Sequence, residues 1–323
     1  MTNSPRAHAA SGLGALAAAL IAVTGLSAGC SEDFDPFNRL VTPRVLAIRS
    51  EPVAPATGET TALDALLYLP QDDSVASMSW SWCPFAGAAN QGYPCLISEE
   101  DLAALGGASA ADIPPYDLGD GKTASFENTL DPAILASVCE GVADQPELFD
   151  CNGGFPAQVK LTLRTEDGRE IDSVRTLRLR FRDTDDPNQN PSVDGLSAEV
   201  GDEEQDIGDE PTVTLPRHDE TVVRVAIPPD VVERYTGVDD QGDPAEVSER
   251  LTVSWFVESG DVKFQHTVFI DGVEPLDDAR ENEWTPDSTT DYAPDTSEVM
   301  VVVRDDREGV AWTSGVVALE DSP

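Results

Sequence analysis

Basic side chains are scarce in this chain, and that scarcity argues against several classes of protein. The 323 residues include 20 Lys and Arg, of which only three are lysines, against 61 Asp and Glu, and the net charge is −41. A body this acidic repels phosphate groups, so we expect neither nucleic-acid binding nor electrostatic attachment to anionic lipid headgroups.

Catalytic and metal-binding signatures are missing as well. Two of the three histidines, His218 and His266, lie downstream of the N-terminal segment, and neither has a Ser or Cys partner at a catalytic or zinc-binding spacing. Carboxylates are so numerous that no pair can be singled out as an acid and a base. We therefore assign no catalytic residue and expect a non-enzymatic protein.

Only the N-terminus holds a sustained apolar run. Arg6 precedes the stretch from Leu13 to Val23, and small residues follow at Ala28 and Gly29. A basic start, about ten apolar residues and a small-residue cleavage site are typical of a secretory signal. No other segment approaches the roughly 18 apolar residues of a membrane-spanning helix. We expect a signal peptide over residues 1–29 and export of the remainder.

The end of this segment, Leu26-Ser-Ala-Gly-Cys30, resembles the lipobox of bacterial lipoproteins. The resemblance implies cleavage before Cys30 and attachment of acyl chains such as palmitate to that cysteine, which would hold the protein on a membrane. Ser31 is similar to the residue that follows the cysteine in lipoproteins sent to the outer membrane. Ser27 stands where the family usually has Leu. An ordinary secretory peptide cut near Ala28, or an uncleaved anchor, is therefore the alternative.

Four further cysteines lie in the N-terminal half: Cys83, Cys95, Cys139 and Cys151. An even number of cysteines in an exported chain indicates two disulfides, and these spacings do not match those of a zinc site. Three connectivities are possible. We favour the pairing of neighbours, 83 with 95 and 139 with 151, over a nested pairing.

Apolar and polar residues alternate over short segments separated by acidic, Gly and Pro turns, which is the pattern of antiparallel strands. Two hairpins, residues 159–181 and 299–319, have the same order of strand, acidic-Gly turn and strand. Arg164 and Arg304 occupy matching places in them. Further strands are expected at 60–69, buried on both faces, and at 221–227 and 264–270.

Tryptophan-bearing strands also recur, at 77–83 and 251–257. This repeat resembles the tandem immunoglobulin-like or PKD-like domains of bacterial surface lipoproteins. The resemblance implies an all-β fold of two tandem Ig-like β-sandwich domains, with Trp82, Trp255 and Trp312 in their cores. The expected divisions are a tether at 30–41, a first sandwich at 42–183, an acidic linker at 184–191 and a second sandwich at 192–320.

Residues 84–155 form a long insertion in the first sandwich, and all four cysteines lie in it or at its edge. Ser98-Glu-Glu-Asp101 predicts one capped short helix, and Asp131-Pro132 opens a second. A loop this long is usually functional or held by its own crosslinks. The disulfides therefore either hold in place a segment that has little hydrophobic core of its own or surround a functional site.

The linker region is rich in oxygen donors: Asp183, Asp185, Asp186, Asn188 and Asn190. It resembles the Asp- and Asn-rich calcium linkers between cadherin repeats. The resemblance implies a calcium ion held by carboxylate and amide oxygens, which would stiffen the joint between the domains. The alternative is that these are ordinary linker residues.

Together these features predict an exported lipoprotein, anchored to the outer membrane by its lipid, with a surface, spacer or binding role. Its partner would be a protein or a glycan at the cell surface, and no cofactor is expected apart from that calcium. Two alternatives stay open: calcium-dependent adhesion or assembly through the linker, and an enzyme with its site in the insertion. Acidic runs such as 201–210 are expected to be solvated loops.

Overall fold

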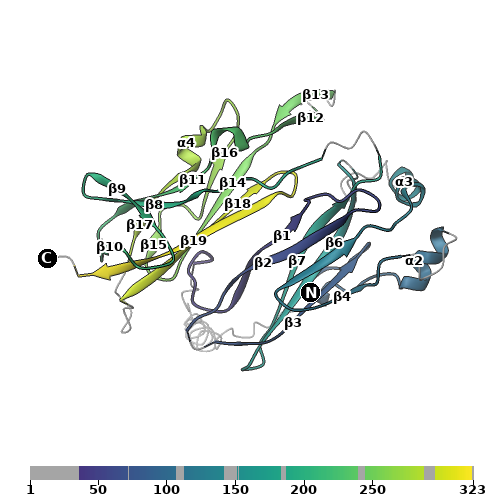
Figure 1. The fold of residues 1–323 in the computed structure, drawn as a ribbon, viewed down its shortest axis with the longest axis horizontal. Coiled ribbons are helices and arrows are strands. Elements are labelled where there is room, and N and C mark those ends of the chain that lie inside the picture. Colours follow the sequence, from purple (N-terminus) through teal and green to yellow (C-terminus); the bar gives the residue numbers. More distant parts are fainter. Residues whose placement is uncertain are drawn as a thin grey trace, which may run out of the picture. The chain divides into compact units, whose positions relative to one another are not determined.

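Stacked β-sheets make up most of the described chain (Figure 1). The computed structural model describes residues 36–323 apart from 72, 107–112, 142–150, 152, 183–186, 239–243, 287–294 and 322–323. The predicted signal peptide and Cys30 lie outside the described residues. Phe37–Pro323 forms one compact unit, and residues 1–36 form another. No helix in the described part has both the length and the apolar character to span a bilayer.

The first sandwich contains seven strands in the described residues. They are β1 (Arg44–Glu51), β2 (Thr60–Tyr68), β3 (Val75–Cys83), β4 (Asp117–Asp120), β5 (Thr123–Glu127), β6 (Phe155–Thr165) and β7 (Glu170–Leu179). One sheet has the order β1-β2-β5 and the other β4-β3-β6-β7, with antiparallel pairing throughout. Alternate residues of β6 are buried, as expected for a strand with one face on a core.

The second sandwich is built from two five-stranded sheets. Their strands are β8 (Gly195–Val200), β9 (Glu203–Ile207), β10 (Val213–Pro216), β11 (Thr221–Ala226), β14 (Leu251–Val257), β15 (Asp261–Val262), β16 (His266–Phe269), β17 (Glu281–Thr285), β18 (Thr296–Asp305) and β19 (Val310–Glu320). The orders are β15-β17-β11-β8-β9 and β10-β19-β18-β14-β16. A separate ribbon pairs β12 (Arg234–Val238) with β13 (Pro244–Ser248).

Both sandwiches have immunoglobulin-like connectivity. In the first, the chain forms β1 and β2 in one sheet and β3 and β4 in the other. It returns to the first sheet with β5 and ends in the β6–β7 hairpin of the second sheet. In the second sandwich, β8, β11, β14, β16, β17, β18 and β19 repeat this path. The strands β9 and β15 are additional edge strands of one sheet, and β10 pairs in parallel with the last strand, β19. The expected all-β fold of two tandem Ig-like sandwiches is confirmed by this topology.

Tryptophans anchor both cores. Four of them are at most 1% exposed: Trp80, Trp82, Trp255 and Trp284. The predicted core placement of Trp82 and Trp255 is therefore confirmed. Trp312 differs, because it packs at the edge of a third apolar cluster between the two sandwiches, where the Arg49 guanidinium lies 4.5 Å from its ring centroid.

This third cluster joins the two sandwiches. Its buried members come from the segment before β1 and from strands of both sandwiches: Leu40, Leu46, Ala47, Tyr68, Phe256, Met300, Val302 and Val310. Burying a large apolar side chain contributes about 1.5–3 kcal/mol. The outer faces of β1 and β18 are therefore covered by protein, and Figure 1 shows β1 beside the β18–β19 hairpin.

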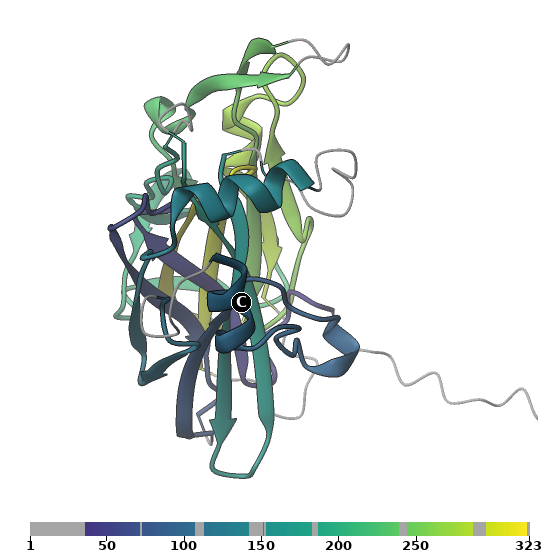
Figure 2. The same cartoon turned by 90° about the vertical axis from the view of Figure 1, so that its right-hand side faces the viewer.

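The insertion at 84–155 is divided by the structure. β4 and β5 lie inside it and belong to the two sheets, so the excursions are the segments before and after these strands. They contain a 3₁₀ turn, η1 (Ala89–Gln91), and two helices, α2 (Glu99–Gly106) and α3 (Pro132–Gly141). Ser98 caps α2 as predicted, and Asp131 caps α3, since each accepts a backbone N–H of the first turn. Both helices lie on one side of the first sandwich, facing the viewer in Figure 2.

Two local expectations are wrong. The strand at 60–69 is not buried on both faces, because the residues of β2 alternate between buried and more exposed positions along its first half. The acidic run at 201–210 is not a loop throughout, since it contains β9. Edge position explains β9: the strand has a partner only on one side, so acidic side chains remain in solvent.

The last residues of the predicted tether are packed rather than free. Leu40 is 2% exposed and its N–H donates to the carbonyl of Val257 at 2.8 Å. Asn38 is 4% exposed, and its carbonyl accepts the N–H of Val257 at 3.0 Å. The chain is thus fixed to the second sandwich before it enters β1 of the first.

Candidate functional site

The first disulfide closes a short loop at the end of the tryptophan strand β3. Cys83 is the last residue of β3 and bonds to Cys95, with the Cα atoms 5.6 Å apart. Inside the loop the backbone folds back on itself, and the N–H of Gly87 donates to the carbonyl of Pro94 at 2.7 Å. The loop is a small excursion fixed at its base by a covalent bond.

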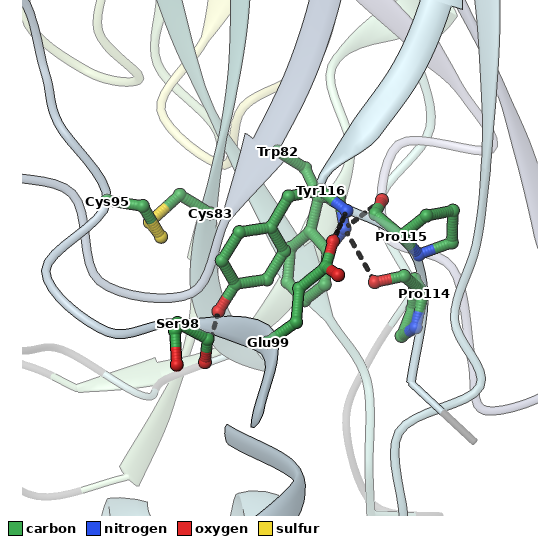
Figure 3. Close-up of a disulfide and its surroundings, with 8 residues drawn as sticks. All are labelled: Trp82, Cys83, Cys95, Ser98, Glu99, Pro114, Pro115 and Tyr116. Atoms are coloured by element: carbon green, nitrogen blue, oxygen red, sulfur yellow. Dashed lines mark hydrogen bonds between the residues drawn. A yellow bond between two sulfur atoms is a disulfide. The ribbon is translucent and has the colours of Figure 1, made fainter. Parts of the chain in front are cut away.

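Trp82, next to this disulfide, is held from several sides (Figure 3). Its indole N–H donates to the carbonyl of Pro115 at 2.8 Å, and its ring contacts Tyr116 edge-on with centroids 5.4 Å apart. The carboxylate of Glu99 accepts the backbone N–H of Tyr116 at 2.6 Å. Burial and the nearby carboxylates Glu99 and Asp101 raise the pKa of Tyr116 to about 12. The phenol therefore stays protonated at neutral pH and cannot act as a general base.

A hollow of about 170 Å³ lies between the disulfide and these rings. Lys160 lines it, and its Nζ lies 3.7 Å from a carboxylate oxygen of Asp172. Ligand sites usually exceed about 300 Å³. Among the described residues that line the hollow, none is an acid or a histidine. The geometry therefore favours a disulfide that holds this loop in place. Nothing in this hollow supports the alternative of an enzyme site in the insertion.

The second disulfide joins α3 to the segment before β6. Cys139 bonds to Cys151, with the Cα atoms 5.9 Å apart, and Cys139 and Leu135 are the buried residues of α3. Arg182 donates to the carbonyl of Cys151 at 2.7 Å. The structure thus contains the neighbour pairing that the sequence favoured. Two disulfides indicate an oxidising, extracytoplasmic environment.

The predicted calcium ligands are described only in part. Three of them lie outside the described residues: Asp183, Asp185 and Asp186. Asn188 is 7% exposed, and its Nδ2 donates to Asp305 and to the carbonyl of Arg307, both at 3.0 Å. Its Oδ1 has no hydrogen-bond partner within the described chain. No cluster of three or more His, Cys, Asp or Glu able to hold a metal occurs among the described residues.

Asn190 connects the two sandwiches through its amide. Its Nδ2 donates to the carbonyl of Ser50 and to the carboxylate of Glu51, both at 2.8 Å, at the end of β1. Its Oδ1 accepts the N–H of Val310 at 2.8 Å, at the start of β19. Both ends of this side chain are therefore used in direct bonds between parts of the protein.

The β18–β19 turn, residues 305–309, is the other half of this joint. The partly buried Asp305 carboxylate accepts two backbone N–H groups of the turn, at 2.6 and 2.8 Å. Arg175, on β7 of the first sandwich, donates to the carbonyl of Glu308 and to that of Ile48, the latter at 2.6 Å. Burial lowers the pKa of Arg175 to about 10, which leaves it charged at neutral pH. We call the hydrogen bonds of Asp305 and Arg175, together with those of Asn188 and Asn190, the clasp.

The matching arginines of the two hairpins have different roles. Arg164 is exposed and pairs with Glu170 at 2.6 Å. Arg304 is partly buried and donates to the carbonyl of Leu46 at 2.7 Å and to the Ser254 hydroxyl at 3.2 Å. Sequence reasoning missed the joint that Arg175 and Arg304 help to form. The available signal was the unbroken apolar run at 299–303, which is typical of a strand buried on both faces.

Two acids near the joint have strongly perturbed pKa values. Burial, followed by the charges of Asp305 and Glu233, raises the pKa of Glu249 to about 7. Burial, followed by the charges of Glu258 and Asp209, raises the pKa of Glu298 to about 7. Both acids therefore change protonation near neutral pH.

Comparison with known proteins adds little to this picture. No protein-family model matches the chain, and no curated protein matches it significantly. Among solved structures, murine CEACAM1b is 9% identical, with 85% of this chain and 99% of that chain covered and a TM-score of 0.22. The D00–D0 domain of intimin is 8% identical, with 87% and 99% covered and a TM-score of 0.21. InvE, a Yersinia pseudotuberculosis adhesin, is 9% identical, with 84% and 58% covered and a TM-score of 0.20. Likenesses this weak carry no argument, so the fold assignment depends on the chain's own sheet topology.

Proposed function

We propose that this chain is an exported lipoprotein, held on the outer membrane through Cys30, that serves as a non-enzymatic binding or spacer module at the cell surface. The two disulfides support export, because such bonds persist in oxidising compartments. The N-terminal segment supports the anchor, because its cleavage region resembles a lipobox. The partner in this proposal is a protein or a glycan of the cell surface.

The observation that carries the module proposal is the clasp. The side chain of Asn190 bonds the end of β1 to the start of β19. The Asp305 carboxylate accepts hydrogen bonds from the side-chain amide of Asn188 in the linker and from a backbone N–H of its own turn. A directly bonded joint of this kind suits a protein that presents two sandwiches together. We place the tether at 30–41, the first sandwich at 42–183, the linker at 184–191 and the second sandwich at 192–320.

The anchor is tested by expressing the full chain in a diderm bacterium and measuring detergent-phase partition and the mass of the N-terminal peptide. We expect a triacylated peptide that begins at Cys30 and recovery in the outer-membrane fraction. A Cys30→Ala chain should lose both properties, and a Ser31→Asp chain should keep the lipid but move to the inner membrane. An unmodified N-terminus in the unsubstituted chain would refute the anchor.

A calcium-stiffened joint is the second candidate, and Asn188 favours it. Its buried Oδ1 has no hydrogen-bond partner in the described chain, and a hard cation prefers such an amide oxygen together with carboxylates. Thermal melts in millimolar calcium and in chelator test this role. We expect a higher melting temperature with calcium and no shift in an Asp185→Asn, Asp186→Asn chain. Equal melting temperatures for the unsubstituted chain would remove this candidate.

A further inference from the structure

A groove of about 430 Å³ opens beside the apolar cluster that joins the two sandwiches. One wall comes from residues 43–46 at the start of β1 and from Ile171 on β7, and the other comes from β14, β16 and β18. The rings of Phe37 and Phe256 lie 5.8 Å apart between centroids. Phe37 is 61% exposed, so the groove has an apolar wall that solvent reaches.

The polar part of this groove is basic, which is unusual in a chain of net charge −41. Arg44, Arg304 and His266 line it, and no acid occurs among the described lining residues. The three come from three different strands, β1, β18 and β16. The hydroxyl of Ser254 lies 3.2 Å from Arg304 Nη1 and 3.1 Å from His266 Nδ1, so one serine on β14 links two of the basic groups.

In the part of the chain that the structure describes, neither arginine pairs with a carboxylate. Within the described chain, Arg44 donates to the carbonyl of Phe37, and Arg304 donates to a carbonyl and a hydroxyl. Arg49 on the same strand as Arg44 pairs with Asp64 at 3.4 Å. Burial lowers the pKa of the Arg304 guanidinium, as expected when no anion offsets its loss of water. A partly buried guanidinium without an anion costs free energy that a bound anion would recover.

We propose that this groove binds a small amphipathic anion, a carboxylate with an aliphatic body. The carboxylate would lie between Arg44 and Arg304, and the aliphatic body would lie on Phe37, Phe256 and Ile171. A volume of about 430 Å³ is within the range usual for small-molecule sites. This inference does not depend on the anchor, because it uses Phe37 and residues of the two sandwiches but neither Cys30 nor its lipid.

Decanoate is the probe, and isothermal titration calorimetry measures its binding. The protein is the secreted full-length chain carrying Cys30→Ala and purified without detergent, so that no other acyl chain competes. We expect saturable binding at one site per chain, and no binding of decyltrimethylammonium, which has the same body and the opposite charge. Equal binding of both amphiphiles would show an apolar patch without anion recognition and would overturn the proposal.

Substitutions locate the site. Arg44→Gln should weaken decanoate binding at least about tenfold, since it removes a charge-assisted hydrogen bond. Arg49→Gln is the matched control, because it removes the same charge from the same strand outside the groove and should change affinity less than about twofold. Ile171→Glu adds a carboxylate to the wall and should abolish binding without removing any hydrogen bond made by Arg44 or Arg304. Unchanged affinity in both groove variants contradicts the proposal.

The chain's own acidic segment is the competing occupant. Glu32, Asp33 and Asp35 precede Phe37 by a few positions. A chain in which all three are replaced by their amides should bind decanoate with unchanged affinity if the ligand comes from outside. Binding that becomes tenfold tighter in this variant would show that the groove serves the chain's own N-terminal segment, and the proposal would fail.

Discussion

Arg164 and Arg304 occupy equivalent positions in two similar hairpins, yet only Arg164 remains in solvent. The difference arises because the outer face of the second hairpin is covered by the first sandwich, whereas Arg164 pairs across an open hairpin with Glu170. Burial near the joint also raises the pKa of two acids. Glu298 and Glu249 have pKa values near 7, so the stability of the joint depends on whether these two acids are protonated.

Stability should therefore rise as the pH falls from 8 to 5. The folded-state pKa of Glu298 is raised above its ordinary value of 4.5, so folding favours its protonated form. The stabilising contribution is fully present below pH 4.5 and is lost as the pH rises through about 7. Glu298→Gln should thus stabilise the chain at pH 8 by about 1 kcal/mol, or roughly 2–4 °C in melting temperature, and change little at pH 5.

Thermal melts by circular dichroism at pH 8 and pH 5 measure this difference. Glu210→Gln is the control for the loss of one negative charge, because Glu210 is exposed. An equal gain for both variants at pH 8 would assign the effect to general charge repulsion and not to burial at the joint.

The sequence predicted local structure well where neighbouring residues decide it. The alternation along β6, the caps at Ser98 and Asp131, and both hairpins follow from residues a few positions apart. The joint could not be derived in the same way, because Arg304 and its acceptor Leu46 are 258 positions apart. Even so, the apolar run at 299–303 indicated burial on both faces, a property that was expected instead for 60–69.

At the scale of elements, the two helical excursions belong to the core of the first sandwich. Leu102 of α2 and Leu135 of α3 are part of its buried cluster, together with Ile113 and Leu130. In the described residues of the excursions, the helical structure is confined to η1, α2 and α3, and fixing the backbone of these segments costs conformational entropy. The disulfides offset part of this loss because they restrict the unfolded chain.

Removal of the first disulfide should therefore destabilise the chain by about 3 kcal/mol, since it closes a loop with a sequence separation of 12. The variant is Cys83→Ala with Cys95→Ala, and the measurement is urea unfolding followed by tryptophan fluorescence. Trp82 is the reporter, because it precedes Cys83 and contacts Tyr116. The Cys139→Ala, Cys151→Ala pair should cost a similar amount. A loss below about 0.5 kcal/mol for both pairs would mean that packing alone holds the excursions.

At the scale of the whole unit, two Ig-like sandwiches are joined by an apolar cluster and by the clasp. Among the described residues, eight buried side chains form the cluster, and the clasp adds hydrogen bonds from Asn188, Asn190 and Arg175. Tandem domains joined only by a flexible linker unfold independently. Here each sandwich buries apolar surface of the other, so unfolding of one exposes part of the other and lowers its stability.

Phe37–Pro323 should consequently unfold in a single calorimetric transition, with a van't Hoff enthalpy equal to the calorimetric one. Val302→Asp should divide it into two transitions, because Val302 is fully buried in the joining cluster while its neighbours Val301 and Val303 form the core of the second sandwich. Val268→Asp is the matched control, since Val268 is 38% exposed on the edge strand β16 and should leave one transition. Two transitions in the unsubstituted chain would show that the joint does not couple the sandwiches, and the clasp would then be too weak to present them together.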